Sequence, residues 1–166
     1  MSVRANLVMG SDGSTTINSR SAQLSSKADR LRFHELRSQA NSILIGGNTA
    51  RNEPYERTPV PLVIISKSGE IPEGVRNNPL VNIWDLDPAS AISKAQGLFG
   101  PDVLVEGGIA LLSVLLQENL IQELFLTISM KTDGENVYDL NSLTRDLTVV
   151  SSEKIGDDTF LKLIQE

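Results

Sequence analysis

Short apolar stretches, each closed by glycine or by polar residues, recur through the first two-thirds of the chain and predict β-strands. The turn sequence "GSDG" closes the first of these strands, and the polar residues that follow it predict a loop. The predicted strands cover residues 3–9, 42–47, 61–66 and 102–105, with a further candidate at 79–84.

Apolar residues at helical spacing lie between these strands. The stretch "SSKADRLRFHELRSQA" carries Phe33, Leu36 and Ala40 on one face, and either of its first two serines can cap the helix. The stretch "DPASAISKAQGLF" begins with Asp87 as a cap and Pro88 at the first helical position. A short helix is predicted in "NTARNE". A leucine-rich helix with core positions is predicted at Leu112, Leu115, Leu116 and Leu120.

The last third of the chain adds strands without intervening long helices. "QELFLTIS" predicts a strand, and residues 146–166 predict a hairpin that turns at Gly156 and Asp157. Because strands and helices alternate before this point, we expect a mostly parallel central sheet flanked by helices, with the hairpin as antiparallel edge strands. The sequence therefore predicts an α/β fold. Since no repeat or linker interrupts it, we expect one domain over residues 1–166.

Composition and charge exclude several kinds of protein. Of the 166 residues, 40% are hydrophobic and 22% are charged, which is ordinary for a globular protein, and the net charge is −6. An acidic chain lacks the basic surface that broad nucleic-acid binding requires, although a local anion site is not excluded. The chain has no cysteine and one histidine, His34, so we expect no metal site built from thiolates or several histidines.

The N-terminal residues show no signal-peptide pattern. No apolar run reaches the length of about 18 residues that a membrane-spanning helix requires. We therefore expect a soluble, cytoplasmic protein that binds neither membranes nor nucleic acids.

One strand ends in a carboxylate that is followed directly by two glycines, Glu106, Gly107 and Gly108. Ligands of open α/β sheets bind at the carboxyl ends of strands, and glycines let a ligand touch the backbone. The helix that follows directs free N–H groups and its positive dipole end to the same point, which favours a phosphate or pyrophosphate. A tight turn that needs positive φ explains the glycines equally well. It does not explain Glu106, because an unpaired carboxylate is costly to bury.

A second strand also ends in two glycines, Gly46 and Gly47. Asn48, Thr49 and Arg51 follow them, and these side chains offer hydrogen-bond donors to an anionic ligand. An ordinary strand exit with an Asn-Thr cap is the alternative. Two such exits in one sheet favour a single cleft built from both.

Three basic side chains, Arg30, His34 and Arg37, lie at helical spacing and form one stripe. A phosphate is one possible partner, but a solvated helix face is the preferred interpretation for Arg30 and His34. Asp12, in the turn after the first strand, is expected on frequency to be a plain Asp-Gly turn residue.

Taken in order, four motifs resemble the reductase domain of riboflavin biosynthesis, a domain often fused to a pyrimidine deaminase. They are Asp-Gly after the first strand, Leu-Arg on the first helix, a Gly-x-x-Thr strand exit, and Glu-Gly-Gly before a leucine-rich helix. The resemblance covers most of residues 3–130 and implies a dihydrofolate-reductase-like fold. It also implies NADPH-dependent reduction of the ribosyl group of a 5-amino-6-(5-phosphoribosylamino)uracil-type substrate to the ribityl form.

The resemblance also implies roles for individual residues. Substrate contacts are implied for Ser21, Arg37 and Glu106. Contacts to NADPH are expected at the two glycine exits and beside them, at Gly47, Asn48, Thr49, Glu53, Gly107, Gly108 and Ile109. From chemistry alone, Ser66 and Lys67 are candidates for the 2′-phosphate of NADPH, with an exposed turn lysine as the alternative for Lys67.

The implied reaction is hydride transfer from the nicotinamide to C1′ of an opened, imine-like ribosylamine. A carboxylate beside a cationic imine stabilises it, so Glu106 is the first candidate catalytic residue and Asp12 the second. The proton that the nitrogen needs comes from Asp12 or from water.

The chain departs from the family pattern at two places. Ser14 stands where many members have a lysine, and "NEPYERTP" stands where many have Asp-x-Pro and a downstream arginine, for which Arg57 is a candidate. The segment "TARNEPY" is closer to a branch described as pyrimidine reductase-like. The alternatives are another NADPH reductase of the same fold, or an NADPH-binding module without catalysis.

The resemblance further implies a homodimer. The apolar strand "ELFLTIS" is expected near a sheet edge, where it would extend the sheet across two chains.

Overall fold

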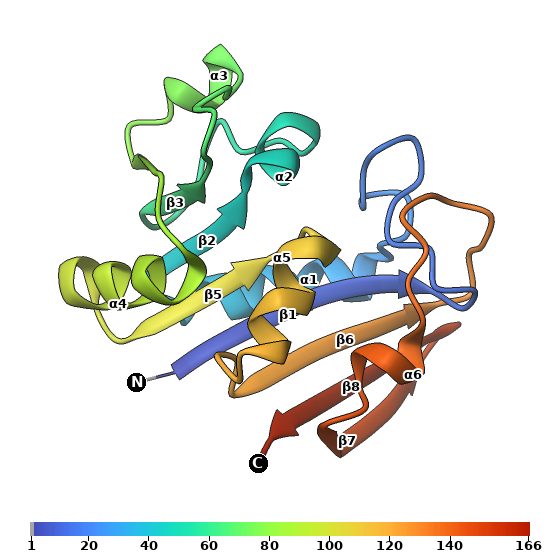
Figure 1. Cartoon of the computed structure of the whole chain (residues 1–166). Coiled ribbons are helices and arrows are strands. Elements are labelled where there is room, and N and C mark those ends of the chain that lie inside the picture. Colours follow the sequence, from blue (N-terminus) through green and yellow to red (C-terminus); the bar gives the residue numbers. More distant parts are fainter. Residues whose placement is uncertain (1) are drawn as a thin grey trace.

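One eight-stranded sheet forms the centre of the protein in the computed structural model, which describes residues 2–166 (Figure 1). Its strands are β1 (Ser2–Gly10), β2 (Ser42–Gly46), β3 (Leu62–Ile65), β4 (Val81–Trp84), β5 (Asp102–Glu106), β6 (Glu123–Ser129), β7 (Leu147–Ile155) and β8 (Asp158–Gln165). Their order in the sheet is β4-β3-β2-β5-β1-β6-β8-β7.

The first six strands run parallel to one another, β8 pairs antiparallel with β6, and β7 pairs antiparallel with β8. The mostly parallel sheet with a C-terminal antiparallel hairpin is therefore confirmed. Gly156, at φ 61°, lies in the hairpin turn, as its position in the sequence predicts.

Four of the six helices follow the predicted pattern. The structure contains α1 (Lys27–Ser38), α2 (Gly47–Asn52), α3 (Glu73–Arg76), α4 (Pro88–Phe99), α5 (Ile109–Gln117) and α6 (Leu140–Leu143). Of the two serines proposed as a cap for α1, Ser26 accepts a hydrogen bond from the Asp29 N–H, and Asp87 caps α4 as expected. The single turns α3 and α6 were not predicted, because four residues are too few to show a helical period.

Helices cover both faces of the sheet (Figure 1). On one face, α4 and α5 pack against alternate residues of β1, such as Ala5 and Leu7, in the largest apolar cluster. Three of the four predicted core leucines of α5 are buried there, and Leu120 packs against the same cluster. On the other face, Leu36 of α1 packs against Leu104 of β5.

The prediction that "ELFLTIS" lies near an edge is wrong. These residues form β6, which lies between β1 and β8. The edge on this side is β7, which is exposed from Thr148 to Ile155 and has a register shift between Val149 and Ser151. Bulges and charged side chains such as Lys154 are features that limit pairing of an edge strand with another chain.

Candidate active site

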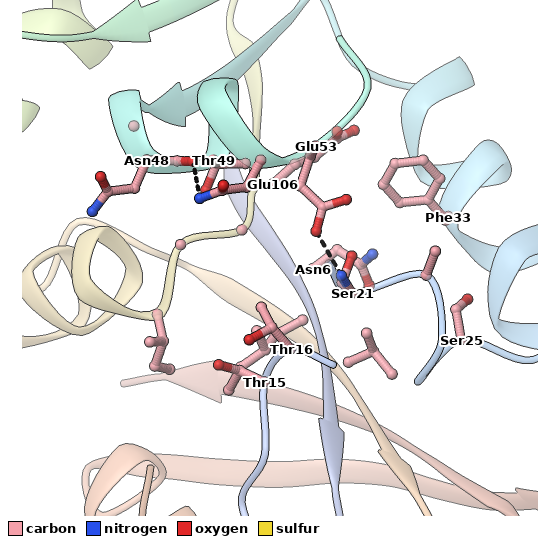
Figure 2. Close-up of a pocket in the computed structure, with 18 of the residues that line it drawn as sticks. Asn6, Thr15, Thr16, Ser21, Ser25, Phe33, Asn48, Thr49, Glu53 and Glu106 are labelled. Carbon is pink, nitrogen blue, oxygen red and sulfur yellow. Dashed lines mark hydrogen bonds between the residues drawn. The ribbon is translucent and has the colours of Figure 1, made fainter. Parts of the chain in front are cut away.

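A cavity of about 630 Å³ opens where β1, β2 and β5 end. Helix α1 lines one side of it, α2 and the first turn of α5 line another, and the loop between β1 and α1 completes the wall (Figure 2). The volume lies within the usual range of small-molecule sites. Both glycine exits contribute to this single cavity, as the sequence predicts.

Glu106, at the end of β5, is buried and bound on both carboxylate oxygens. Arg37 of α1 donates from Nε to Oε1 at 2.6 Å and from Nη2 to Oε2 at 2.7 Å. The Tyr55 hydroxyl donates to Oε2 at 2.9 Å. The side chain of Glu106 is 3% exposed and that of Arg37 is 13% exposed, so the pair is largely shielded from water. These partners explain how a carboxylate can be buried at the end of an apolar strand.

The surroundings of this ion pair fix the protonation of its partners. The Arg37 guanidinium carbon lies 4.3 Å from the centre of the Phe33 ring and 5.6 Å from that of Tyr55. Burial alone lowers the pKa of Arg37, but the hydrogen bonds and charge of Glu106 outweigh it and raise that pKa above its ordinary value. Burial, followed by the Glu106 charge, raises the pKa of Tyr55 well above its ordinary value. Tyr55 therefore remains a hydrogen-bond donor throughout the neutral range.

Tyr55→Phe removes this donor and is expected to lower the free energy of unfolding by about 1.5–3 kcal/mol, as for other hydrogen bonds to charged groups. Urea unfolding of the variant measures the change. Tyr138, the other tyrosine, is the matched control, because it lies outside the cavity lining and away from Glu106. Equal stability changes for Tyr55→Phe and Tyr138→Phe would contradict a bond of this strength.

The two glycines after Glu106 have backbone conformations that favour glycine. Gly107 has φ 73° and Gly108 has φ 78°, and a Cβ atom on Gly108 would lie 3.0 Å from the Thr49 Oγ1 atom. The positive-φ turn and the close backbone approach are therefore both present. Helix α5 starts without a side-chain cap from the described residues, and its first three residues line the cavity. Free N–H groups of a helix start can bind an anion there.

A hydrogen bond joins the loop before α1 to the end of α2. The Ser21 N–H donates to the Glu53 Oε1 atom at 2.6 Å, as the dashed line in Figure 2 shows. The carboxylate that the resemblance assigns to the cofactor thus contacts the backbone of the serine assigned to the substrate.

Most of the predicted site residues are brought together in the cavity, although this does not test their roles. Its lining includes Ser21, Arg37, Gly47, Asn48, Thr49, Glu53, Glu106, Gly107, Gly108 and Ile109. The lining leaves out Asp12, Ser66 and Lys67.

Asp12 serves the loop structure instead of facing the cavity. Its Oδ1 atom accepts from the Ser14 N–H at 3.0 Å and from the Ser14 hydroxyl at 2.7 Å, and Oδ2 accepts from the Asp133 N–H at 2.8 Å. These hydrogen bonds, led by that of the Ser14 hydroxyl, hold the pKa of Asp12 below its ordinary value. Ser14, which stands where many family members have a lysine, thus binds and orients Asp12.

Ser66 and Lys67 lie behind the second glycine exit. Ser66 is 9% exposed, and its hydroxyl accepts a hydrogen bond from the Gly69 N–H at 3.1 Å. A Cβ atom on Gly47 would lie 3.5 Å from the Ser66 Oγ atom and 3.1 Å from the Arg51 Nη1 atom. Arg51, which also donates to the Asn48 side chain, is therefore the cation next to this exit.

The basic stripe on α1 has two surroundings. Arg37 is paired with Glu106, whereas Arg30 and His34 are exposed and also line the cavity. The solvated-face interpretation of Arg30 and His34 is therefore compatible with a position at the cavity rim. Arg57 lies outside the cavity lining.

Sequence reasoning missed several lining residues. Asn6 could have been found from the sequence, because it is a polar residue in the middle of an otherwise apolar strand. Tyr55 gave no such signal, since its bond to Glu106 joins residues 51 positions apart. Thr15 and Asn136 come from two separate loops that are joined by a hydrogen bond of 2.8 Å from the Thr15 hydroxyl to the Asn136 carbonyl.

Among solved structures, the chain is similar to RibD and pyrimidine reductase proteins. Acinetobacter baumannii RibD matches 99% of the chain with TM-score 0.76 and 18% identity. A diaminohydroxyphosphoribosylaminopyrimidine deaminase/5-amino-6-(5-phosphoribosylamino)uracil reductase from Thermotoga maritima matches 99% of it with TM-score 0.71 and 20% identity. The chain spans 58% and 56% of these two proteins. A pyrimidine reductase-like protein from Corynebacterium diphtheriae is covered to 91%, with 98% of this chain matched, TM-score 0.73 and 16% identity.

The predicted dihydrofolate-reductase-like α/β fold is confirmed by these likenesses. No curated protein matches the sequence. Among the described residues, no helix is both long and apolar enough to cross a bilayer. The family of RibD C-terminal domains matches residues 1–161, which is nearly the whole chain. The chain therefore belongs to the RibD C-terminal domain family.

Proposed function

We propose that this chain reduces the ribosyl group of a 5-amino-6-(5-phosphoribosylamino)uracil-type substrate to the ribityl form in riboflavin biosynthesis, with NADPH as the reductant. The observation that carries the proposal is one cavity in which two glycine exits lie beside the buried Arg37–Glu106 pair. Glycine exits suit a dinucleotide. The Arg37–Glu106 pair, which forms the polar floor of the cavity, suits a second ligand that forms hydrogen bonds.

The residues at the glycine exits fit NADPH. Gly107 and Gly108 leave the backbone open, and the first turn of α5 offers N–H groups to a pyrophosphate. Thr49 lies against Gly108, so the two exits hold the same ligand from both sides. When bound, NADPH supplies the hydride.

Selectivity for NADPH over NADH requires a cation or hydroxyl at the 2′-phosphate. Lys67 is exposed, and Arg51 and Ser66 flank Gly47. We assign the 2′-phosphate to these three side chains, with Arg51 as the residue best placed for a bidentate contact.

The floor of the cavity orients the substrate. Glu106, which accepts from Arg37 on both oxygens, keeps further lone pairs available for a hydrogen bond from a substrate hydroxyl or amine. Its charge beside the reacting carbon favours a cationic, imine-like form of the ribosylamine. Because Asp12 is bound within the loops, we assign delivery of the proton to water.

Arg30 and His34 are the side chains we assign to the substrate phosphate, since both line the cavity and the charge of nearby Arg37 is already balanced. Arg30→Gln is expected to raise the KM for the phosphorylated substrate about tenfold, which corresponds to about 1.4 kcal/mol of lost charge-assisted binding. Steady-state kinetics measure this change, with Arg57→Gln as the matched control outside the cavity. A KM that rises equally in both variants would assign the effect to general charge.

The proposal is tested by titrating the protein with NADPH, with NADH as the control, and then following NADPH oxidation with the pyrimidine ribosylamine phosphate. NADPH-selective binding together with substrate-dependent oxidation supports the proposal. Binding without oxidation of this substrate, but with oxidation by dihydrofolate or another imine, would identify a different reductase. Binding without oxidation by any substrate would identify a non-catalytic NADPH-binding module.

We further propose that the working form is a cytoplasmic homodimer. The family resemblance supports this form, and the exposed apolar side chains of Val149 and Val150 on β7 offer a surface for packing against a second chain without continued strand pairing. Sedimentation equilibrium checks the oligomeric state, and a monomer at micromolar concentration would contradict it.

A further inference from the structure

Asn6 lies in the middle of β1, lines the cavity and has an incomplete set of hydrogen bonds (Figure 2). Its Oδ1 atom is buried, and no group within residues 2–166 donates to it. Native structures leave few buried polar atoms without a partner, because such atoms are destabilising. Because the Asn6 side chain lines the cavity, a rotation of its amide group would let a ligand there complete its hydrogen bonding.

Asn6 stands directly beside Glu106. The two residues are register partners in the parallel pair β1–β5, so their side chains leave the same face of the sheet. Both oxygens of Glu106 already accept hydrogen bonds from Arg37 and Tyr55. Asn6 differs from Glu106 in that its Oδ1 atom has no hydrogen-bond partner at all within the described residues.

The chemistry of an amide selects the ligand group. A carboxamide is uncharged and both donates and accepts, which matches a hydroxyl group better than a phosphate. The pyrophosphate donors that we assign to the cofactor start after Glu106, at Gly107 and Gly108. Asn6 itself lies on β1, the strand that enters the loop carrying Ser21.

We infer that Asn6 is a substrate-binding residue that hydrogen-bonds a sugar hydroxyl of the substrate. This inference rests on the proposed function and adds a residue that recognises the sugar of the substrate. It predicts a specific trade-off, because an unpartnered buried amide is unfavourable for the free protein and favourable only in the complex.

Asn6→Leu tests the inference, since leucine has a similar size and no polar atoms. We expect the KM for the substrate to rise at least about tenfold, the Kd for NADPH to stay unchanged, and the Tm to stay equal or rise. Ser42→Ala is the matched control. Ser42 on β2 also has a buried side-chain oxygen without a partner in the described part of the chain, and it lies outside the cavity lining. Ser42→Ala should have the KM of the wild type, and its Tm should equal or exceed that of the wild type.

Three results would overturn the inference. An unchanged KM in Asn6→Leu would show that the amide does not contact the substrate. A weaker Kd for NADPH with an unchanged KM would assign the amide to the cofactor. A fall in Tm, not seen in Ser42→Ala, would give Asn6 a structural role.

A second ligand separates this inference from the proposed function. If the wild type does not oxidise NADPH with the pyrimidine ribosylamine phosphate, the proposed function fails, and calorimetry with ribose 5-phosphate then tests Asn6 alone. Binding to the wild type that is lost in Asn6→Leu supports a sugar contact. Equal binding by both proteins, or no binding by the wild type, overturns it.

Discussion

Arg37→Ala is expected to lower the free energy of unfolding by about 3–5 kcal/mol, the cost of removing one partner of a buried ion pair. The variant leaves Glu106, which is 3% exposed, without its counter-charge and with the Tyr55 hydroxyl as its remaining donor. The KM for the phosphorylated substrate should also rise, because Arg37 holds the Glu106 carboxylate that orients the substrate. The Kd for NADPH should be retained, because Arg37 lies on α1 and not at the glycine exits. Urea unfolding and steady-state kinetics measure the two effects.

The control is a second arginine of the same helix. Arg30→Ala removes an exposed side chain and is expected to change the free energy of unfolding by no more than about 0.5 kcal/mol. The double variant Arg37→Met with Glu106→Leu removes both charges and should recover most of the stability without recovering activity. A loss as small in Arg37→Ala as in Arg30→Ala would show that water, and not Arg37, balances the charge of Glu106.

Gly108→Val is expected to weaken NADPH binding about a hundredfold or more. The added side chain occupies the backbone surface where the pyrophosphate is assigned, and the loss of two charge-assisted hydrogen bonds is worth about 3 kcal/mol. Fluorescence titration with NADPH measures the effect. Some stability should also be lost, because φ is 78° and a Cβ atom would lie 3.0 Å from Thr49 Oγ1.

Gly156→Val separates backbone strain from loss of the binding surface. Gly156 also has positive φ, at 61°, but a Cβ atom there meets nothing within 4 Å, and the residue lies in the β7–β8 turn. This variant should lose stability and keep the NADPH affinity of the wild type. If Gly108→Val kept that affinity as well, the pyrophosphate would have to bind elsewhere.

The sequence pattern predicts the parts of this site that depend on neighbouring residues. Apolar runs ended by glycines locate β2 and β5 and their exits, and the Ser26 cap follows from helix-start chemistry. Glu106 was singled out because an apolar strand rarely ends in a buried carboxylate, and its burial is now explained by Arg37 and Tyr55.

Contacts between distant segments could not be predicted in the same way. Arg37 and Glu106 are 69 positions apart, and Asp12 is drawn away from the cavity by the Asp133 N–H, 121 positions later. Each contact depends on which strands become neighbours, and local patterns do not specify that order. Because the strand order was unknown, β6 was expected near an edge of the sheet, although β8 pairs with it on that side.

The central position of β1 has a consequence for how the chain folds. Its neighbours are β5 and β6, so Ser2 pairs with Asp102 and Arg4 pairs with Glu123. β1 therefore has no strand partner until about a hundred residues more of this domain have left the ribosome. Sheets closed by such distant pairings fold slowly and expose apolar strands to aggregation in the meantime. Yield during rapid expression should consequently depend on temperature and chaperones more than the stability of the finished protein would suggest.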